Sequence, residues 1–220
     1  MVHHIYLEGI VGKSITKKSV VSNLSGVKAD DTVLIHIHSN GGDVEEGWSI
    51  HDYLVSESTR IGFQIDTIIE GVCKSIATLF FALGQNRIIT PNSRLLIHNP
   101  WGKNEGDAAS MIRYAEALAI EENRLAEFYA SSIGASVDQV RKWMEVETEY
   151  NAQQAVSMGF ATAVGLEKAD YQDMKAVALI SKFHTNNKPK MSKPSFNVQG
   201  FVEKAKRALK ALTGEIKAFD

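Results

Sequence analysis

The chain has 220 residues, of which 44% are hydrophobic and 23% charged, and its formal net charge at pH 7 is −2. These values are typical of a soluble globular protein with one sizeable core, and they give no reason to expect nucleic acid or an anionic membrane as a partner. The single cysteine excludes an internal disulfide framework, and no Cys/His cluster has the spacing of a zinc site. Without a signal-peptide pattern or a long apolar run, a cytoplasmic protein is expected.

Short apolar runs alternate with helical patterns along the chain, which predicts an α/β fold with a largely parallel sheet. Strands are expected at 5–7, 32–38, 64–70, 87–90 and 94–97. Helices are expected at 17–24, 47–56, 77–84, 107–132, 137–144 and 152–158. Ser136 and Asn151 are expected to cap the last two helices, and Gly159 to end the final one.

The composition changes after His184, so the main domain is predicted to span 1–184. Residues 185–199 contain two Lys-Pro pairs and no apolar periodicity, which is typical of a linker. Residues 200–220 carry a basic amphipathic pattern, clearest from Phe201 to Ile216. This tail is interpreted as a helix that packs on a neighbouring subunit or partner rather than on a membrane.

Ser75 lies between the strand-like run 64–70 and the small-residue helical run that begins at Ala77. A serine at such a corner is near a helix N-terminus, which can help to stabilise the negative charge that forms when a hydroxyl attacks a carbonyl. Serine is also a preferred N-cap residue. The local pattern therefore leaves both a nucleophile and a simple cap open.

Three further features could complete a catalytic site. The pair Gly41-Gly42 follows a strand, where backbone amides could bind an oxyanion, although such a pair is often only a turn. His98 ends the strand 94–97 and could act as a general base. A carboxylate to orient the imidazole could come from the acidic cluster Glu145, Glu147 and Glu149, which would otherwise be a solvated face.

Taken together, the segment from about Ile5 to Val164 resembles the family of Clp protease proteolytic subunits (ClpP), with its phage and prophage head-maturation relatives. The matching segments are 37–44 (IHSNGGDV), 71–77 (GVCKSIA), 91–100 (PNSRLLIHNP) and 152–161 (AQQAVSMGFA). They resemble the family's oxyanion loop, its nucleophile elbow, the segment around its catalytic base and the segment after its catalytic acid.

The resemblance implies a βαβ superhelical fold, shared with crotonases, and a long protruding helix at 107–132. It implies an ATP-independent serine endopeptidase in which Ser75 is the nucleophile, His98 the base and Glu147 the acid. The resemblance also places the oxyanion hole at the amides of Gly42 and Ile76. No metal or organic cofactor is expected, and a ring-forming homo-oligomer is implied.

Several positions depart from the family pattern, among them Ile76-Ala77, which replaces a common Met-Gly after the serine. Asn40 replaces a usual proline, and Glu147 stands where aspartate is usual, so that Glu145 or Glu149 could take the acid's role. Cys73 and Lys74 replace small residues before the serine. Cys73 is a rival nucleophile that is expected to be buried and inert, and Lys74 is a rival base whose side chain is expected to point away.

The tail favours the phage branch, with capsid or scaffold proteins as substrates. A cellular protein-turnover peptidase that works with an ATP-driven unfoldase is the alternative, although the chain begins almost at the family's first strand, which argues against such docking. Two other classes stay open. One is an acyl-CoA hydratase or hydrolase of the same fold, and the other is an inactive assembly module.

Overall fold

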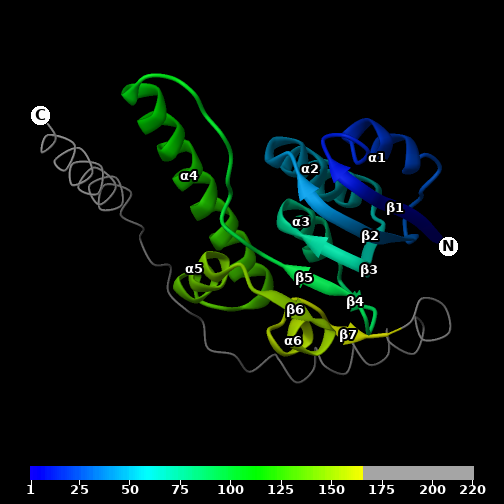
Figure 1. Cartoon of the computed structure of the whole chain (residues 1–220). Coiled ribbons are helices and arrows are strands. Elements are labelled where there is room, and N and C mark those ends of the chain that lie inside the picture. The colour runs from blue at the N-terminus through cyan, green and yellow to red at the C-terminus, as the bar shows by residue number, and fades with distance from the viewer. Residues whose placement is uncertain (166–220) are drawn as a thin grey trace, which may run out of the picture.

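In the computed structural model, which describes residues 1–165, seven strands form one sheet (Figure 1). The strands are β1 (Val2–Val11), β2 (Thr32–Gly42), β3 (Gln64–Lys74), β4 (Arg87–Ile89), β5 (Arg94–Leu96), β6 (Glu149–Asn151) and β7 (Ala163–Val164). Strands β1, β2, β3, β4 and β7 are neighbours in that order, and all pair in parallel. Strand β5 pairs in parallel with β3 and antiparallel with β6. The predicted α/β class with a mostly parallel sheet is confirmed.

All but one of the described α-helices begin at a side-chain cap, the exception being the short helix that follows Ala77. They are α1 (Lys17–Asn23), α2 (Val44–Ile61), α3 (Thr78–Ala82), α4 (Ala108–Ile133), α5 (Val137–Val146) and α6 (Ala152–Ser157), with a 3₁₀ turn η1 (Ser75–Ala77) before α3. Ser136 and Asn151 accept hydrogen bonds from backbone N–H groups in the first turns of α5 and α6, as predicted. Asp43 caps α2 in the same way, so this helix begins three residues earlier than expected.

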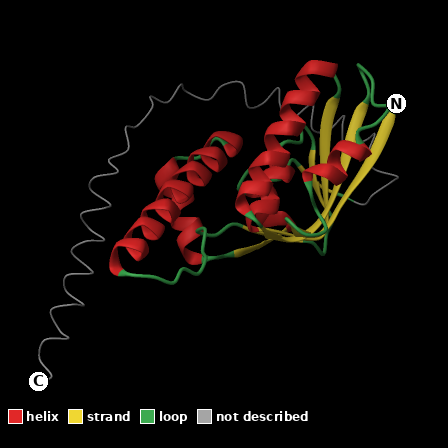
Figure 2. Ribbon diagram, turned by 90° about the horizontal axis from the view of Figure 1, so that it is seen from above, coloured by secondary structure: helices red, strands yellow, loops and turns green. Residues whose placement is uncertain are grey.

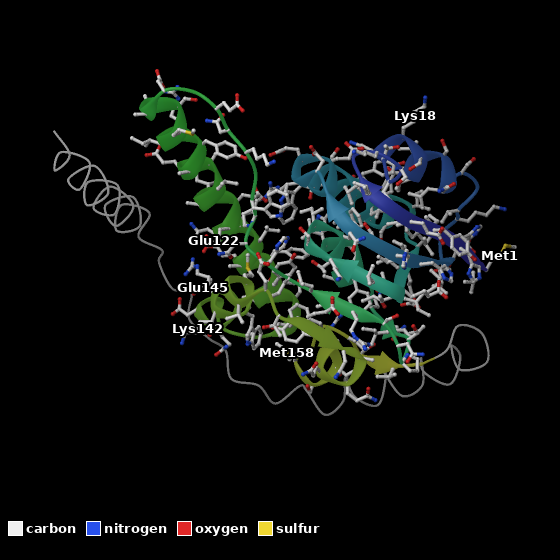
Figure 3. All side chains as sticks on the ribbon, viewed as in Figure 1. Met1, Lys18, Glu122, Lys142, Glu145 and Met158 are labelled. Carbon is white, nitrogen blue, oxygen red and sulfur yellow. The ribbon has the colours of Figure 1, made fainter. Side chains whose placement is uncertain are left out.

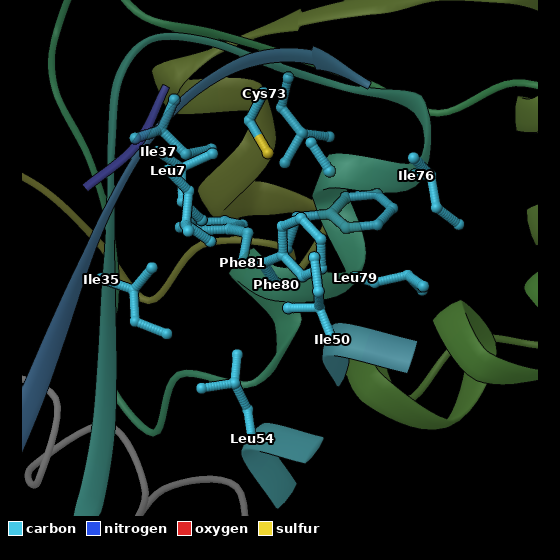
Figure 4. Close-up of a cluster of buried hydrophobic side chains, with 14 of the residues drawn as sticks. Leu7, Ile35, Ile37, Ile50, Leu54, Cys73, Ile76, Leu79, Phe80 and Phe81 are labelled. Atoms are coloured by element: carbon cyan, nitrogen blue, oxygen red, sulfur yellow. The ribbon is translucent and has the colours of Figure 1, made fainter. Parts of the chain in front are cut away.

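Helices α2 and α3 pack on one face of the sheet, and α4 extends away from it (Figures 1 and 2). Between the sheet and these helices lies a buried cluster of aliphatic and aromatic side chains (Figure 4). Its members include Leu7, Ile37, Ile50, Leu54, Phe80 and Phe81. This packing fixes the carboxyl ends of β2 and β3, where the sequence places the glycine pair and Ser75.

Strand β3 changes partner halfway along its length. Its first half pairs with β4 (Ile69 with Ile89), and its second half pairs with β5 (Val72 with Arg94). The buried Ser93 hydroxyl joins the branches, because it accepts a hydrogen bond from the Gly71 N–H at 2.7 Å and donates to the Ile69 carbonyl at 3.0 Å. The turn before β5 is thereby fixed to the point where β3 divides.

Several elements differ from the sequence-based expectations. The strands β1, β2 and β3 are longer than expected, and β2 runs through Gly42 because Ile10 and Val11 pair with the two glycines. Helix α3 is shorter than the predicted 77–84, since it begins at Thr78 after the 3₁₀ turn η1 and ends at Ala82. Strands β6 and β7 were not predicted, since segments of three and two residues carry no readable periodicity.

The predicted linker (185–199), the basic helix (200–220) and the end of the predicted domain at 184 lie outside the described residues. Within residues 1–165, the structure contains no helix with the length and apolar character needed to cross a membrane.

Candidate active site

The chain turns sharply at Ser75, directly after β3. Ser75 has a φ of 55°, in the left-handed region, and is the first residue of η1. This conformation costs a non-glycine residue about 1–2 kcal/mol, so the surroundings must hold it. Gly41 lies against it, because a Cβ on Gly41 would be 2.7 Å from the Ser75 Cβ and 2.9 Å from the Lys74 carbonyl oxygen. The corner therefore requires glycine at position 41.

His98 reaches this corner from β5. Lys74, the last residue of β3, pairs with Leu96 at the end of β5, so the two strands deliver Ser75 and His98 to the same edge of the sheet. The His98 Nε2 atom is 2.8 Å from the Ser75 Oγ atom, and the His98 side chain is largely buried. The structure thus brings together the predicted nucleophile and the predicted base.

Glu147 lies between α5 and β6, the strand that runs antiparallel to β5. Helix α5 ends at Val146, and Glu147 adopts a left-handed conformation with a φ of 53°. In the antiparallel register of β5 and β6, Leu96 pairs with Glu149, so extending the register by two places sets His98 opposite Glu147. The Glu147 Oε1 atom is 3.5 Å from His98 Nδ1, and the Glu147 side chain is 65% exposed. This distance is longer than that of a short hydrogen bond.

The other two glutamates of the cluster have different partners. Glu149 Oε2 is 2.5 Å from the Lys74 ammonium, and its other carboxylate oxygen is 3.8 Å from Arg94 Nε. Glu145 lies on α5 beside Glu122 of α4 (Figure 3). Burial raises the pKa of Glu122, and the charge of Glu145 raises it further. Of the three glutamates, Glu147 is the one paired with His98, and Lys74 is paired with Glu149.

Cys73 points into the hydrophobic core (Figure 4). Its side chain is fully buried, and burial raises the pKa of the thiol well above its usual range. Because the thiolate is the reactive form of cysteine, this environment suppresses nucleophilic chemistry at Cys73.

The two predicted oxyanion donors, the amides of Ile76 and Gly42, lie in different surroundings near Ser75. Ile76 lies in the first turn of η1, where backbone N–H groups lack partners within the helix, and its side chain packs against Gly47 of α2. Gly42 lies against β1, since a Cβ there would be 2.2 Å from the Val11 carbonyl oxygen. The part of Ile76 and of Gly42 in an oxyanion hole stays a prediction.

Gly41 was not singled out by the sequence reasoning, although it contacts Ser75. Its N–H donates to the Ser39 hydroxyl at 3.1 Å, and that hydroxyl donates to the Gly9 carbonyl at 2.7 Å. The sequence feature that could have identified Gly41 was its place in the pair Gly41-Gly42. Among residues 1–165, no group of three or more His, Cys, Asp or Glu side chains is arranged to hold a metal ion.

A serine hydrogen-bonded to a histidine at the carboxyl edge of a mostly parallel sheet, with a carboxylate beyond the ring, has the geometry of a hydrolytic site. The family model described as Clp protease matches residues 2–168, and the chain therefore belongs to the Clp protease family. Membership of this family makes the protein a ClpP-like peptidase.

Two relatives are named as proteolytic subunits of this family. The "ATP-dependent Clp protease proteolytic subunit" of Pleurastrum terricola is 29% identical over 152 residues, which cover 68% of this chain and 76% of the relative. The "ATP-dependent Clp protease proteolytic subunit 1" of Leifsonia xyli subsp. xyli is 30% identical over 146 residues, which cover 64% of this chain and 72% of the relative.

Proposed function

We propose that this peptidase is a serine endopeptidase whose triad is Ser75, His98 and Glu147. The observation that supports it most directly is the 2.8 Å contact between Ser75 Oγ and His98 Nε2. For Nε2 to take the hydroxyl proton, the neutral ring must carry its hydrogen on Nδ1, which faces the Glu147 carboxylate at 3.5 Å. Glu147 then favours this tautomer and stabilises the imidazolium that forms during attack. Catalytic hydrogen bonds of this kind often shorten when substrate binds.

In this mechanism Ser75 attacks the scissile carbonyl while His98 removes its proton. The backbone amides of Gly42 and Ile76 are proposed to bind the oxyanion, and losing one such donor typically costs about 10²–10³ in rate. His98 next protonates the leaving amine, and water hydrolyses the acyl-enzyme with His98 again as base. The proposed reaction uses no metal and no organic cofactor.

Covalent labelling with a fluorophosphonate probe tests the assignment. The wild-type chain and a Cys73→Ala variant are expected to be labelled at Ser75, whereas Ser75→Ala should be neither labelled nor active on peptides. Labelling of Ser75→Ala at another residue would overturn the triad. A folded wild-type protein that resists the probe would support an inactive assembly module, and thioester turnover without peptide cleavage would support an acyl-CoA enzyme.

For the biological substrate, we infer ATP-independent cleavage of phage or prophage capsid or scaffold proteins. The support is the departure at Asn40, Cys73 and Lys74 from the usual family pattern, together with the linker-like and basic composition after His184. Cleavage of a purified capsid or scaffold protein in a buffer without ATP is the expected result.

A second candidate is protein turnover together with an ATP-driven unfoldase. It is favoured by the names of both relatives, which describe ATP-dependent proteolytic subunits. Proteins of this family form ring oligomers and work with Clp unfoldases. The mass of the native assembly tests the expected ring-forming homo-oligomer. Degradation of a folded protein only when ATP and an unfoldase are added would favour turnover over maturation.

A further inference from the structure

Two buried hydroxyl groups connect the serine corner to α4. The Thr78 hydroxyl donates a hydrogen bond to the Ser75 carbonyl oxygen at 2.6 Å. The same Thr78 oxygen is 2.6 Å from the hydroxyl of Tyr129, which lies 51 residues further along the chain. Both side chains are 2% exposed. The contact therefore joins the turn after β3 to the long helix through polar groups that are removed from water.

The direction of these hydrogen bonds follows from counting hydrogens. Thr78 has one hydroxyl hydrogen, and the Ser75 carbonyl accepts it. Tyr129 must therefore donate its own hydroxyl hydrogen to the Thr78 oxygen. Burial raises the pKa of Tyr129 well above its usual range, so the phenol keeps that hydrogen at neutral pH. The result is an ordered relay from Tyr129 to Thr78 to Ser75.

The position of Tyr129 is itself restrained by aromatic contacts. Its ring meets those of Phe128 and Phe160 edge-on, with centroid separations of 5.6 and 6.2 Å. Because two aromatic rings contact the Tyr129 ring, its hydroxyl presents a fixed donor to Thr78. A displacement of α4 at this level would therefore be transmitted to the carbonyl of Ser75.

We propose that Thr78 and Tyr129 are positioning residues that hold Ser75 in its left-handed conformation and thereby aim its hydroxyl at His98. This inference rests on the proposed role of Ser75 as the nucleophile. Ser75 needs such support because a serine at a φ of 55° is strained, and this conformation persists only where neighbouring groups favour it. The relay supplies such a group at the carbonyl of the strained residue.

The test measures the rate of fluorophosphonate labelling at saturating probe, which reports nucleophile alignment rather than probe binding. Thr78→Val and Tyr129→Phe are each expected to slow labelling about three- to tenfold, the value of one buried hydrogen bond. Thr78→Ser keeps the hydroxyl and is expected to keep most of the rate. In a Thr78→Val background, Tyr129→Phe should add nothing, since Tyr129 acts through Thr78.

The matched control is Thr67→Val. Thr67 is also fully buried, and its hydroxyl also donates to a backbone carbonyl, that of Phe81 at 2.9 Å, but it does not touch Ser75. Thr67→Val is expected to label at the wild-type rate even if it lowers the unfolding temperature. Equal slowing by Thr67→Val and Thr78→Val, or wild-type labelling by Thr78→Val, would overturn the relay.

Hydrogen exchange of the full chain separates failure of the relay from failure of the proposed function. Thr78→Val and Tyr129→Phe are expected to speed exchange of the backbone amide at position 78, which donates to the Ser75 carbonyl, relative to Thr67→Val, whether or not the probe reacts. A wild-type protein that is not labelled at Ser75 would contradict the proposed function. Unchanged exchange at this amide would contradict the relay.

Discussion

Glu147 lies opposite His98 because β6 runs antiparallel to β5, and Glu149, two residues further on, lies opposite Leu96. The segment 147–149, of which only Glu149 belongs to β6, thus presents two carboxylates to different side chains. Glu147 faces the imidazole, whereas Glu149 pairs with Lys74, the residue that precedes Ser75. The segment that brings the acid to His98 therefore also contacts the end of β3.

Replacing the two carboxylates separately tests which one serves His98. Glu147→Gln is expected to lower kcat by about 10²-fold, at the low end of the range for general acid–base groups because the side chain is mostly exposed. Glu149→Gln is expected to cost at most about 1 kcal/mol of stability, since its pair with Lys74 is partly exposed. Peptidase rates and thermal unfolding check both, and a larger loss of kcat in Glu149→Gln would reassign the acid.

Gly41→Ala is expected to break the contact between the Ser75 hydroxyl and His98. Gly41 and Gly26 both have left-handed φ values, of 92° and 86°, so alanine at either position is expected to cost about 1–2 kcal/mol. A Cβ at position 26 meets nothing within 4 Å, whereas one at position 41 collides with Ser75. Only Gly41→Ala is expected to lose labelling by the probe. Wild-type labelling of Gly41→Ala would show that the collision relaxes without moving Ser75.

Cys73 is expected to be unreactive in the folded protein. A maleimide or disulfide reagent at pH 8 should modify it only as fast as the chain unfolds, because its thiol is buried and its pKa is raised by that burial. Adding denaturant should expose one reactive thiol per chain. Rapid modification of the native protein, with loss of activity, would restore Cys73 as a candidate nucleophile.

Asp31 should make stability depend on pH. The Met1 α-ammonium, the Lys28 N–H and the His3 ring hold the pKa of Asp31 well below its usual range. A carboxyl with a lowered pKa in the folded state adds stability above its unfolded pKa of about 3.9, and this is lost as the pH falls toward the folded value. With a free Met1 amine, the unfolding-temperature gap between wild type and Asp31→Asn should be full at pH 5–6 and narrow toward pH 3. A constant gap would contradict this.

The apolar runs at 64–70 and 94–97 were sufficient to place Ser75 and His98 after two strands, and the family resemblance indicated that the two side chains act together. Glu147 was harder, since its position depends on a left-handed residue and on a three-residue strand that carries no periodicity. The contact between Thr78 and Tyr129 spans 51 residues and could not be predicted from local patterns. Which glycine of the pair Gly41-Gly42 contacts Ser75 depends on the distance between the two backbones in the folded protein. The spacing of residues along the sequence does not give that distance.

The hydrogen bonds of the Ser93 hydroxyl to β3 give the loop before β5 less tolerance to changes in length than the loop after it. One extra residue between Thr90 and Arg94 would shift His98 by about 3.3 Å along the strand and turn its side chain to the other face. Ser93 resists such a shift, since its hydroxyl is bonded at once to Thr90 and to both sides of the bend in β3. The segment 99–106 follows His98, so insertions there leave the pairing of β3 and β5 unchanged. Variation among related chains should therefore concentrate after the histidine and not before it.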